Sequence, residues 1–136
     1  MKKLLLLPMV CLVLFGCADK KVQEQSLRDS VVSIHEKVMG EDGKLEDGKT
    51  ALDAFVKANP NSTLTDSARF YINKLTLADS AMMIWMHDFN PDLTTKPHEE
   101  NMAYLGKQKK LVMQIDSQIN AALDASTKFI AKTKTK

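Results

Sequence analysis

Residues 63–92 read TLTDSARFYINKLTLADSAMMIWMHDFNPD, and apolar residues recur in this stretch at intervals of seven. The row consists of Ala68, Leu75, Met82 and Phe89. A seven-residue repeat places its members on one stripe of an α-helix. Asn90-Pro91 ends the pattern, because the residue that precedes a proline disfavours the helical conformation. The stretch therefore predicts a long amphipathic helix that ends near Phe89.

Similar rows occur on both sides of this helix. The first, over residues 26–57, consists of Val31, Val38, Leu45 and Leu52, with Ile34 and Phe55 beside it. The other, which begins near Pro97 and fades before Lys132, contains Leu105, Val112, Ile115, Ile119, Ala122 and Phe129. No segment alternates with the period of two that is typical of β-strands. We therefore predict an all-α fold over residues 26–132, an antiparallel up-down-up three-helix bundle with long helices.

Glycines interrupt the first of these helices. Gly40 and Gly43 lie in its middle, and Gly48 follows. A glycine in a helix interior costs about 1 kcal/mol relative to alanine. The heptad row nonetheless continues through the glycines without a shift, which favours one continuous helix with a weak middle. The alternative is a four-helix arrangement in which this helix is broken near Gly40 and Gly43.

The N-terminus is typical of a secretory leader. Lys2 and Lys3 precede an apolar run that is too short to span a membrane. Leu14 and Gly16 stand three and one positions before Cys17, a spacing that resembles the lipobox of bacterial lipoproteins. The resemblance implies a signal peptide over residues 1–16, acyl chains on Cys17, and a lipid-anchored protein of the cell envelope, on the outer membrane. Residues 17–25 are expected to be the lipidated cysteine and a polar tether, and residues 133–136 a basic tail.

Cysteine count and charge exclude several classes of protein. Cys11 departs with the leader and Cys17 carries lipid, so neither a disulfide framework nor a CxxCH haem attachment is expected. The 19 basic residues include Lys2 and Lys3, so 17 remain against 17 acidic residues after cleavage. A near-neutral chain lacks the clustered positive charge that phosphate backbones require, and nucleic acid is not an expected partner.

Three segments carry a resemblance to a known family. They are SIHEKVM (residues 33–39), WMHDFNPD (residues 85–92) and HEENMAYLGKQKK (residues 98–110). Together they resemble a family of short lipoproteins from Bacteroidota, some of which are labelled "viral A-type inclusion protein". The resemblance covers most of the chain after the leader. It implies an envelope location and a helical fold, and it implies no enzymatic mechanism.

Simple geometry predicts that these segments meet at the end of the bundle nearer to the anchor. A hairpin centred near residue 61 sets His35 level with His87 and Met39 level with Met83. A second loop centred near residue 93 sets residues 85–87 level with residues 99–102. Within each helix the His and Met stand one turn apart on one face. The four side chains are therefore candidates to line one side of the contact between the first two helices.

Imidazole and thioether together suit a soft metal such as Cu(I), and they also form an axial pair for haem iron. The alternative is that these residues pack the structure, because methionine fills irregular gaps in cores. No serine stands in a nucleophile elbow and no glycine run matches a phosphate-binding loop. We expect a non-enzymatic helical scaffold or interaction module without a cofactor, with an envelope protein as partner. The competing expectation is a copper- or haem-binding protein that uses His35, Met39, Met83 and His87.

Overall fold

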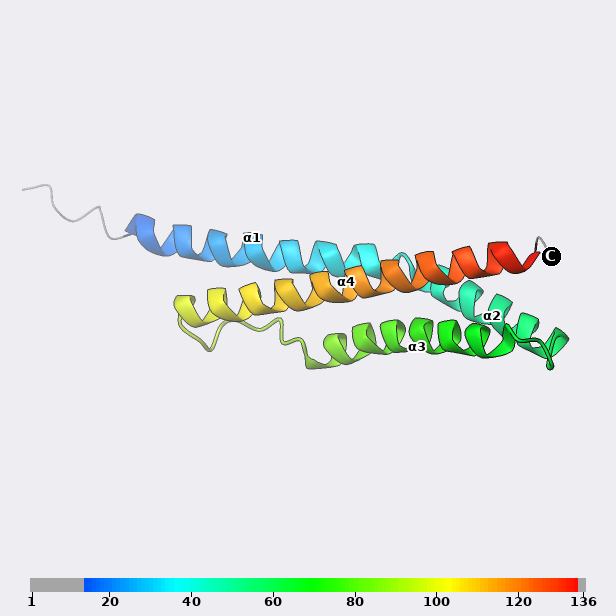
Figure 1. The fold of residues 1–136 in the computed structure, drawn as a ribbon. Coiled ribbons are helices and arrows are strands. Elements are labelled where there is room, and N and C mark those ends of the chain that lie inside the picture. The colour runs from blue at the N-terminus through cyan, green and yellow to red at the C-terminus, as the bar shows by residue number, and fades with distance from the viewer. Residues whose placement is uncertain (1–13, 135–136) are drawn as a thin grey trace, which may run out of the picture.

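The computed structural model describes residues 14–134, and over that range it contains helices and no strand (Figure 1). The four helices are α1 (Leu14–Met39), α2 (Asp42–Ala58), α3 (Thr65–Asp88) and α4 (His98–Lys134). α1 and α2 are joined into one rod with a bend of 31°, so the fold is a bundle of three rods. The predicted all-α three-helix bundle is confirmed, with its first rod bent.

The bend lies at Gly40 and Glu41, where the helical hydrogen bonding changes. The Glu41 N–H donates to the carbonyl of Val38 at 2.9 Å, a tighter turn than the α-helical one, and the Leu45 N–H then donates to Glu41 O at 3.1 Å. A Cβ atom on Gly40 would lie 3.2 Å from Lys37 O. Glycine therefore permits the close backbone approach that redirects the rod.

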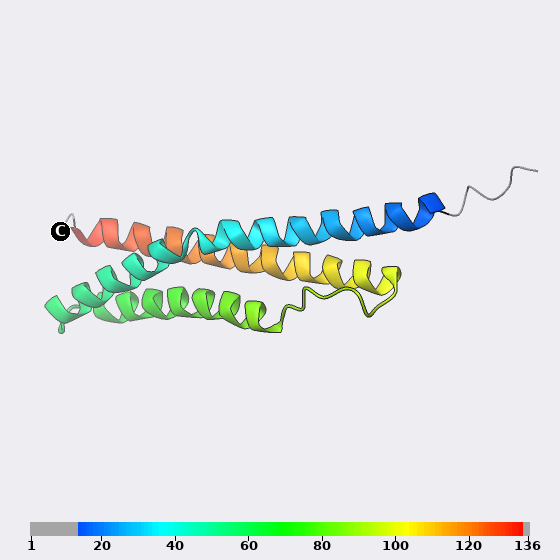
Figure 2. The same cartoon turned by 180° about the vertical axis from the view of Figure 1, so that it is seen from behind.

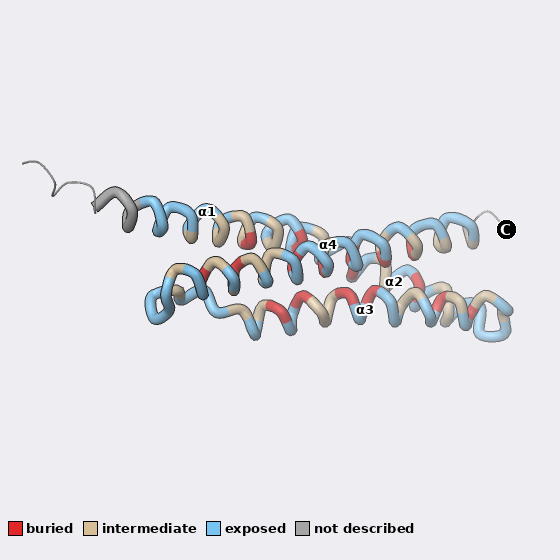
Figure 3. Tube along the Cα trace, turned by 60° about the vertical axis from the view of Figure 1, so that its left-hand side comes forward, coloured by how far each residue is buried: buried red, intermediate tan, exposed pale blue. Residues whose placement is uncertain are grey.

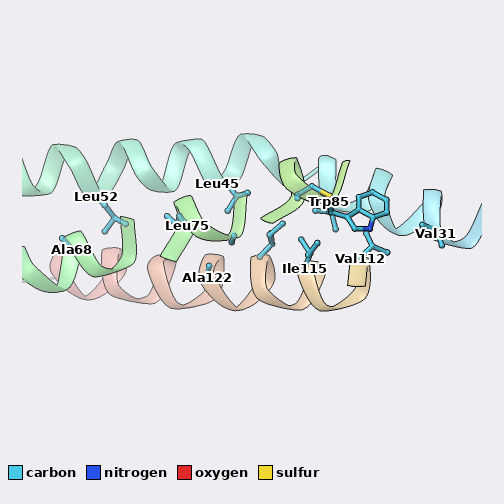
Figure 4. Close-up of a cluster of buried hydrophobic side chains, with 13 residues drawn as sticks. Val31, Leu45, Leu52, Ala68, Leu75, Trp85, Val112, Ile115 and Ala122 are labelled. Atoms are coloured by element: carbon cyan, nitrogen blue, oxygen red, sulfur yellow. The ribbon is translucent and has the colours of Figure 1, made fainter. Parts of the chain in front are cut away.

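The core is built from the predicted rows (Figures 3 and 4). The row Val31, Val38, Leu45 and Leu52 is almost fully buried. Ala68, Leu75 and Met82 of the row on α3 are almost fully buried as well. Phe89 and Phe129 are partly buried against the same core. The buried residues of α4 are Leu105, Val112, Ile115, Ile119 and Ala122, together with Asn101 and Ser126. One continuous apolar core thus runs through the bundle.

Each half of the bent rod has a different main neighbour. α1 packs chiefly against α4, and α2 packs chiefly against α3. α4, with 37 residues, is long enough to accompany both halves (Figures 1 and 2). The start of α1 and the start of α4 extend past the end of α3, and the connection over residues 89–97 runs alongside that extension.

The tether prediction is wrong for the residues that the structure describes. Residues 18–25 are helical and belong to α1. The Lys20 ammonium pairs with the Glu99 carboxylate at 3.1 Å, which joins this segment to the start of α4. The expected tether is therefore part of the fold, because its polar side chains have partners on α4.

The terminal predictions fall largely outside the described range. Residues 1–13 of the predicted leader and residues 135–136 of the predicted tail lie outside it, as does the side chain of Cys17. Residue 134 still belongs to α4. Within residues 14–134, no helix combines the length and the apolar character that a membrane crossing requires.

Candidate functional site

His35, the first of the predicted donor residues, contacts α3 from the last turns of α1. Its Nε2 atom lies 2.9 Å from the Met86 sulfur, and its ring centroid lies 5.6 Å from that of Trp85. The predicted height of His35 along α3 is therefore right to within one residue. Its partner is Met86, and not Met83 or His87.

The four predicted donors do not form one site. His87 has a side chain that is 89% exposed and pairs with the Asp88 carboxylate at 3.0 Å. Met39 and Met83 are exposed, and both border a small cavity of about 20 Å³ beside Val38. The predicted convergence fails because His35 contacts Met86 and Trp85, whereas the side chain of His87 is exposed. Among residues 14–134, no three His, Cys, Asp or Glu side chains are grouped as metal ligands.

The second and third family-like segments do meet, but in a different register from the one predicted. The Trp85 indole N–H donates to Gln108 Oε1 at 2.8 Å. The backbone N–H of Asn90 donates to the Tyr104 hydroxyl at 2.8 Å, and Phe89 stacks between Trp85 and Tyr104. The prediction set Trp85 level with residues 99–102. It assumed a tight loop, whereas residues 89–97 run along the bundle before α4 begins.

The start of α4 contacts an earlier part of α1 through partly buried polar groups. His98 Nδ1 lies 2.7 Å from Glu24 Oε1, and each of these side chains is 17% exposed. The Asn101 amide donates to Glu24 Oε2 at 3.2 Å and to the Leu93 carbonyl at 2.8 Å. Asn101 Oδ1 is buried and has no hydrogen-bond donor within the described part of the chain. This cluster joins α1, α4 and the connecting loop.

An exposed apolar row on α3 was not predicted from the sequence. It is a second row on α3, which we call the α3 row, whose members are 55%, 59% and 63% exposed: Phe70, Leu77 and Ile84. The signal was present in the sequence, because these residues also recur at intervals of seven. Leu111 on α4 is a further exposed apolar residue.

A groove of about 410 Å³ lies beside the α3 row, between α3 and α4. We call it the α3–α4 groove, and its lining consists of Phe70, Tyr71, Lys74, Leu77 and Ala78 from α3 and Gln118, Ala121, Ala122 and Ala125 from α4. The alanines make the α4 wall shallow, which leaves room for a side chain from outside. Lys74 is the one charged residue of this lining, and its ammonium lies 5.3 Å from the centroid of the Phe70 ring.

The geometry of the groove suits binding to an apolar surface. Exposed apolar side chains beside a groove are a mark of a contact site. A shallow wall of small residues allows another helix to approach closely, as holes receive knobs in coiled coils. No family model, curated protein or solved structure matches this chain.

Proposed function

We propose that this protein is a lipid-anchored interaction module of the cell envelope, and that its α3–α4 groove receives an apolar helix of a protein partner. The single observation that carries the proposal is the exposed α3 row beside that groove. In this proposal the protein acts by binding and not by catalysis.

The two faces of α3 support the proposal. Leu75 is fully buried in the bundle, whereas Leu77, two positions later, is 59% exposed. Two residues correspond to about 200° of helical rotation, so α3 carries an apolar row on each of two opposite faces. α3 thus carries a second apolar row that the described part of the chain leaves exposed.

The proposed partner surface is an amphipathic helix. A seven-residue spacing presents a straight line of contacts, and a helix with apolar residues at the same spacing can lie along it. The alanine wall accommodates the larger side chains of such a helix. Lys74 at the edge would favour a partner that carries an acceptor or an acidic residue at that height.

The proposed anchor is the acylated Cys17. The lipobox-like spacing before Cys17 supports it, together with the resemblance of the later segments to envelope lipoproteins. α1 is helical from Leu14 onward and is joined to α4 from Lys20 onward. The helical domain would thus begin close to the lipid and hold the α3–α4 groove at a fixed distance from the membrane surface.

Site-specific photo-cross-linking in cells tests the contact site. A photoreactive amino acid replaces Leu77 in the full chain, and a matched variant carries it at Asp53, which is exposed on α2. We expect a discrete cross-linked product from the Leu77 position and none from the Asp53 position. The proposal is wrong when Phe70, Leu77 and Ile84 all fail to give a product.

Anchoring is tested separately by Cys17→Ser. We expect the unsubstituted chain to incorporate labelled fatty acid and to sediment with membranes, and the variant to do neither. A variant that still sediments with membranes and still carries the label would overturn the proposed anchor. The experiment measures fatty-acid incorporation and sedimentation with membranes. We expect the substitution to leave the fold intact, because Cys17 lies ahead of the packed part of α1.

Copper binding is the second candidate, and the contact between His35 and Met86 is the observation that favours it. The two side chains supply one imidazole and one thioether, which are soft donors. A Cu(I) competition titration compares the chain with His35→Ala and with His87→Ala. Tight one-to-one binding that only His35→Ala abolishes would favour this function, whereas absent binding, or binding that both variants keep, would exclude it.

A further inference from the structure

We propose that Met39, Met82 and Met83 form a binding site for a soft monovalent cation, Cu(I) or its analogue Ag(I), beside the bend of the first rod. The three side chains border the same small cavity. This thioether site is separate from the contact between His35 and Met86, and it does not involve the α3–α4 groove. The inference therefore goes beyond the proposed interaction module and is tested independently of it.

The cavity lies at the bend between α1 and α2, where this bent rod faces α3 and α4. Met39 is the last residue of α1, and Met82 and Met83 belong to α3. The other residues of the lining are aliphatic or acidic: Val38, Asp42, Leu45, Asp79 and Ile119. Thioethers from two different rods, far apart in the sequence, thus come together around one space.

The exposure of these methionines differs from that of side chains that only fill a gap. Met82 is 3% exposed, whereas Met39 is 39% and Met83 56% exposed. Methionine often fills irregular gaps in cores, and that role accounts for Met82. It does not account for two further methionines that border the same cavity and stay in contact with water. Their flexible side chains give an ion a path of entry and can turn toward it.

The size of the cavity limits what it can hold. Its volume is about 20 Å³, and roughly 10–15 Å³ is enough for one water molecule. Pockets for organic ligands measure about 300–1,000 Å³. The cavity therefore suits a single ion and is far too small for haem or another organic cofactor.

The donor set selects a soft cation. Thioethers are soft ligands that favour Cu(I), whereas Mg²⁺ and Ca²⁺ take about six or more oxygen ligands. Among the described residues of the lining, Asp42 and Asp79 alone carry side-chain oxygens, and Asp79 Oδ2 already pairs with Lys49 Nζ at 3.2 Å. The two carboxylates favour a cation through their charge. They are too few to bind a hard metal ion.

A titration with Ag(I) locates the site through the methionines themselves. The probe is silver nitrate in chloride-free buffer, and the protein is the full chain in detergent, with carbon-13 in its methionine methyl groups. Cys11→Ser and Cys17→Ser are present in every sample, because free thiols would compete for the ion. Methyl resonances are then followed by NMR as the ion is added.

We expect the methyl resonances of Met39, Met82 and Met83 to shift together and to saturate at one ion per chain. The resonance of Met113, which is exposed on α4 outside the cavity, should stay in place. Shifts of Met113 that equal those of Met83 would mean an adventitious ion only and would overturn the site. Unchanged resonances of all three cavity methionines would overturn it as well.

Two exposed methionines provide a matched pair of variants. Met83 is 56% exposed at the cavity, and Met113 is 53% exposed away from it. Leucine keeps nearly the volume of methionine but has no sulfur. Met83→Leu should weaken Cu(I) binding by about tenfold or more, since even the outer partners of metal ligands contribute that much. Met113→Leu should leave the affinity unchanged. Competition with a chromophoric Cu(I) chelator measures both, and equal affinities would overturn the site.

The same titration separates the thioether site from the second candidate function. Cu(I) binding that Met83→Leu weakens and His35→Ala keeps would support the thioether site. Binding that His35→Ala abolishes and Met83→Leu keeps would overturn it and favour the contact between His35 and Met86. The α3–α4 groove is tested by the photo-cross-link from Leu77, so its failure and the failure of the thioether site are distinguishable.

Discussion

Glu24 Oε1 lies 2.7 Å from His98 Nδ1, so a carboxylate in the first half of α1 contacts the first residue of α4 across 74 positions of sequence. The second carboxylate oxygen accepts from the Asn101 amide at 3.2 Å. These bonds hold together the two helices that extend past the end of α3. The segment between the proposed anchor and the core is thereby structured.

Glu24→Ala should loosen this end of the bundle. The substitution removes the acceptor for His98 and one acceptor for Asn101, which leaves partly buried polar groups with fewer partners. We expect the free energy of unfolding to fall by about 1–3 kcal/mol, and amide exchange over residues 19–30 to become faster. Amide hydrogen exchange, measured by mass spectrometry, reports both the lower free energy of unfolding and the faster local exchange. Glu36→Ala, on the exposed face of α1, should change neither.

Two leucines on α3 should respond differently to the same substitution. Leu75 is fully buried, and Leu75→Ala should destabilise the fold by about 2–5 kcal/mol through lost burial and the cavity left behind. Leu77 is 59% exposed, and Leu77→Ala should cost less than about 1 kcal/mol in dilute solution. Urea unfolding followed by circular dichroism measures both. Equal losses would contradict the observed orientation of α3.

Glycine substitutions test the packing around α4 and α2. Gly106 lies inside α4, and a Cβ there would meet no atom within 4 Å. Gly106→Ala should therefore raise the free energy of unfolding by about 0.5–1 kcal/mol through helix propensity. A Cβ on Gly48 would lie 3.1 Å from Leu75 Cδ1, so the leucine tip must move. In the same unfolding experiment, Gly48→Ala should raise the free energy of unfolding by less than Gly106→Ala does.

The loop between α3 and α4 contains a carboxylate whose pKa is set by one neighbour. The Thr94 hydroxyl and the Thr94 backbone N–H donate to Asp92 Oδ1, at 2.7 Å and 2.9 Å, and these bonds lower the pKa of Asp92. A lowered pKa means that the bonds favour the carboxylate form. Their stabilisation is therefore present above the ordinary range of an aspartate and is lost as the pH falls through the lowered pKa.

Thr94→Val removes the hydroxyl and keeps the shape of the side chain. We expect the pKa of Asp92 to rise toward its ordinary value, measured by NMR titration of the side-chain carboxyl carbon. Thr95→Val is the matched control and should leave that pKa unchanged. An unchanged pKa in Thr94→Val would assign the effect to the backbone N–H alone.

The helices and their buried rows could be predicted from the sequence because helical periodicity is a local property. Val31, Val38, Leu45 and Leu52 share a stripe whatever the rest of the chain does, and all four are buried. The proline-terminated end of α3 is also local, and it was placed to within one residue. The height of His35 along α3 followed from the short turn after α2.

The register between α3 and α4 could not be predicted in the same way. It depends on the path of residues 89–97, which includes Asp92 N donating to Asn90 Oδ1 at 2.9 Å and runs along the bundle without a tight reversal. Trp85 therefore reaches Gln108. The bend at Gly40 is likewise the result of packing, because α1 follows α4 while α2 follows α3.

Periodicity identified the row of α3 that is buried, and tertiary structure determined that its second apolar row stays exposed. Ala68, Leu75 and Met82 recur every seven residues and are buried, whereas Phe70, Leu77 and Ile84 recur at the same interval and are exposed. The spacing is identical, so periodicity alone did not show that the second row would stay exposed. The choice is made by the total burial that α2 and α4 achieve against one face of α3, which is a property of the whole packed chain and not of any local segment.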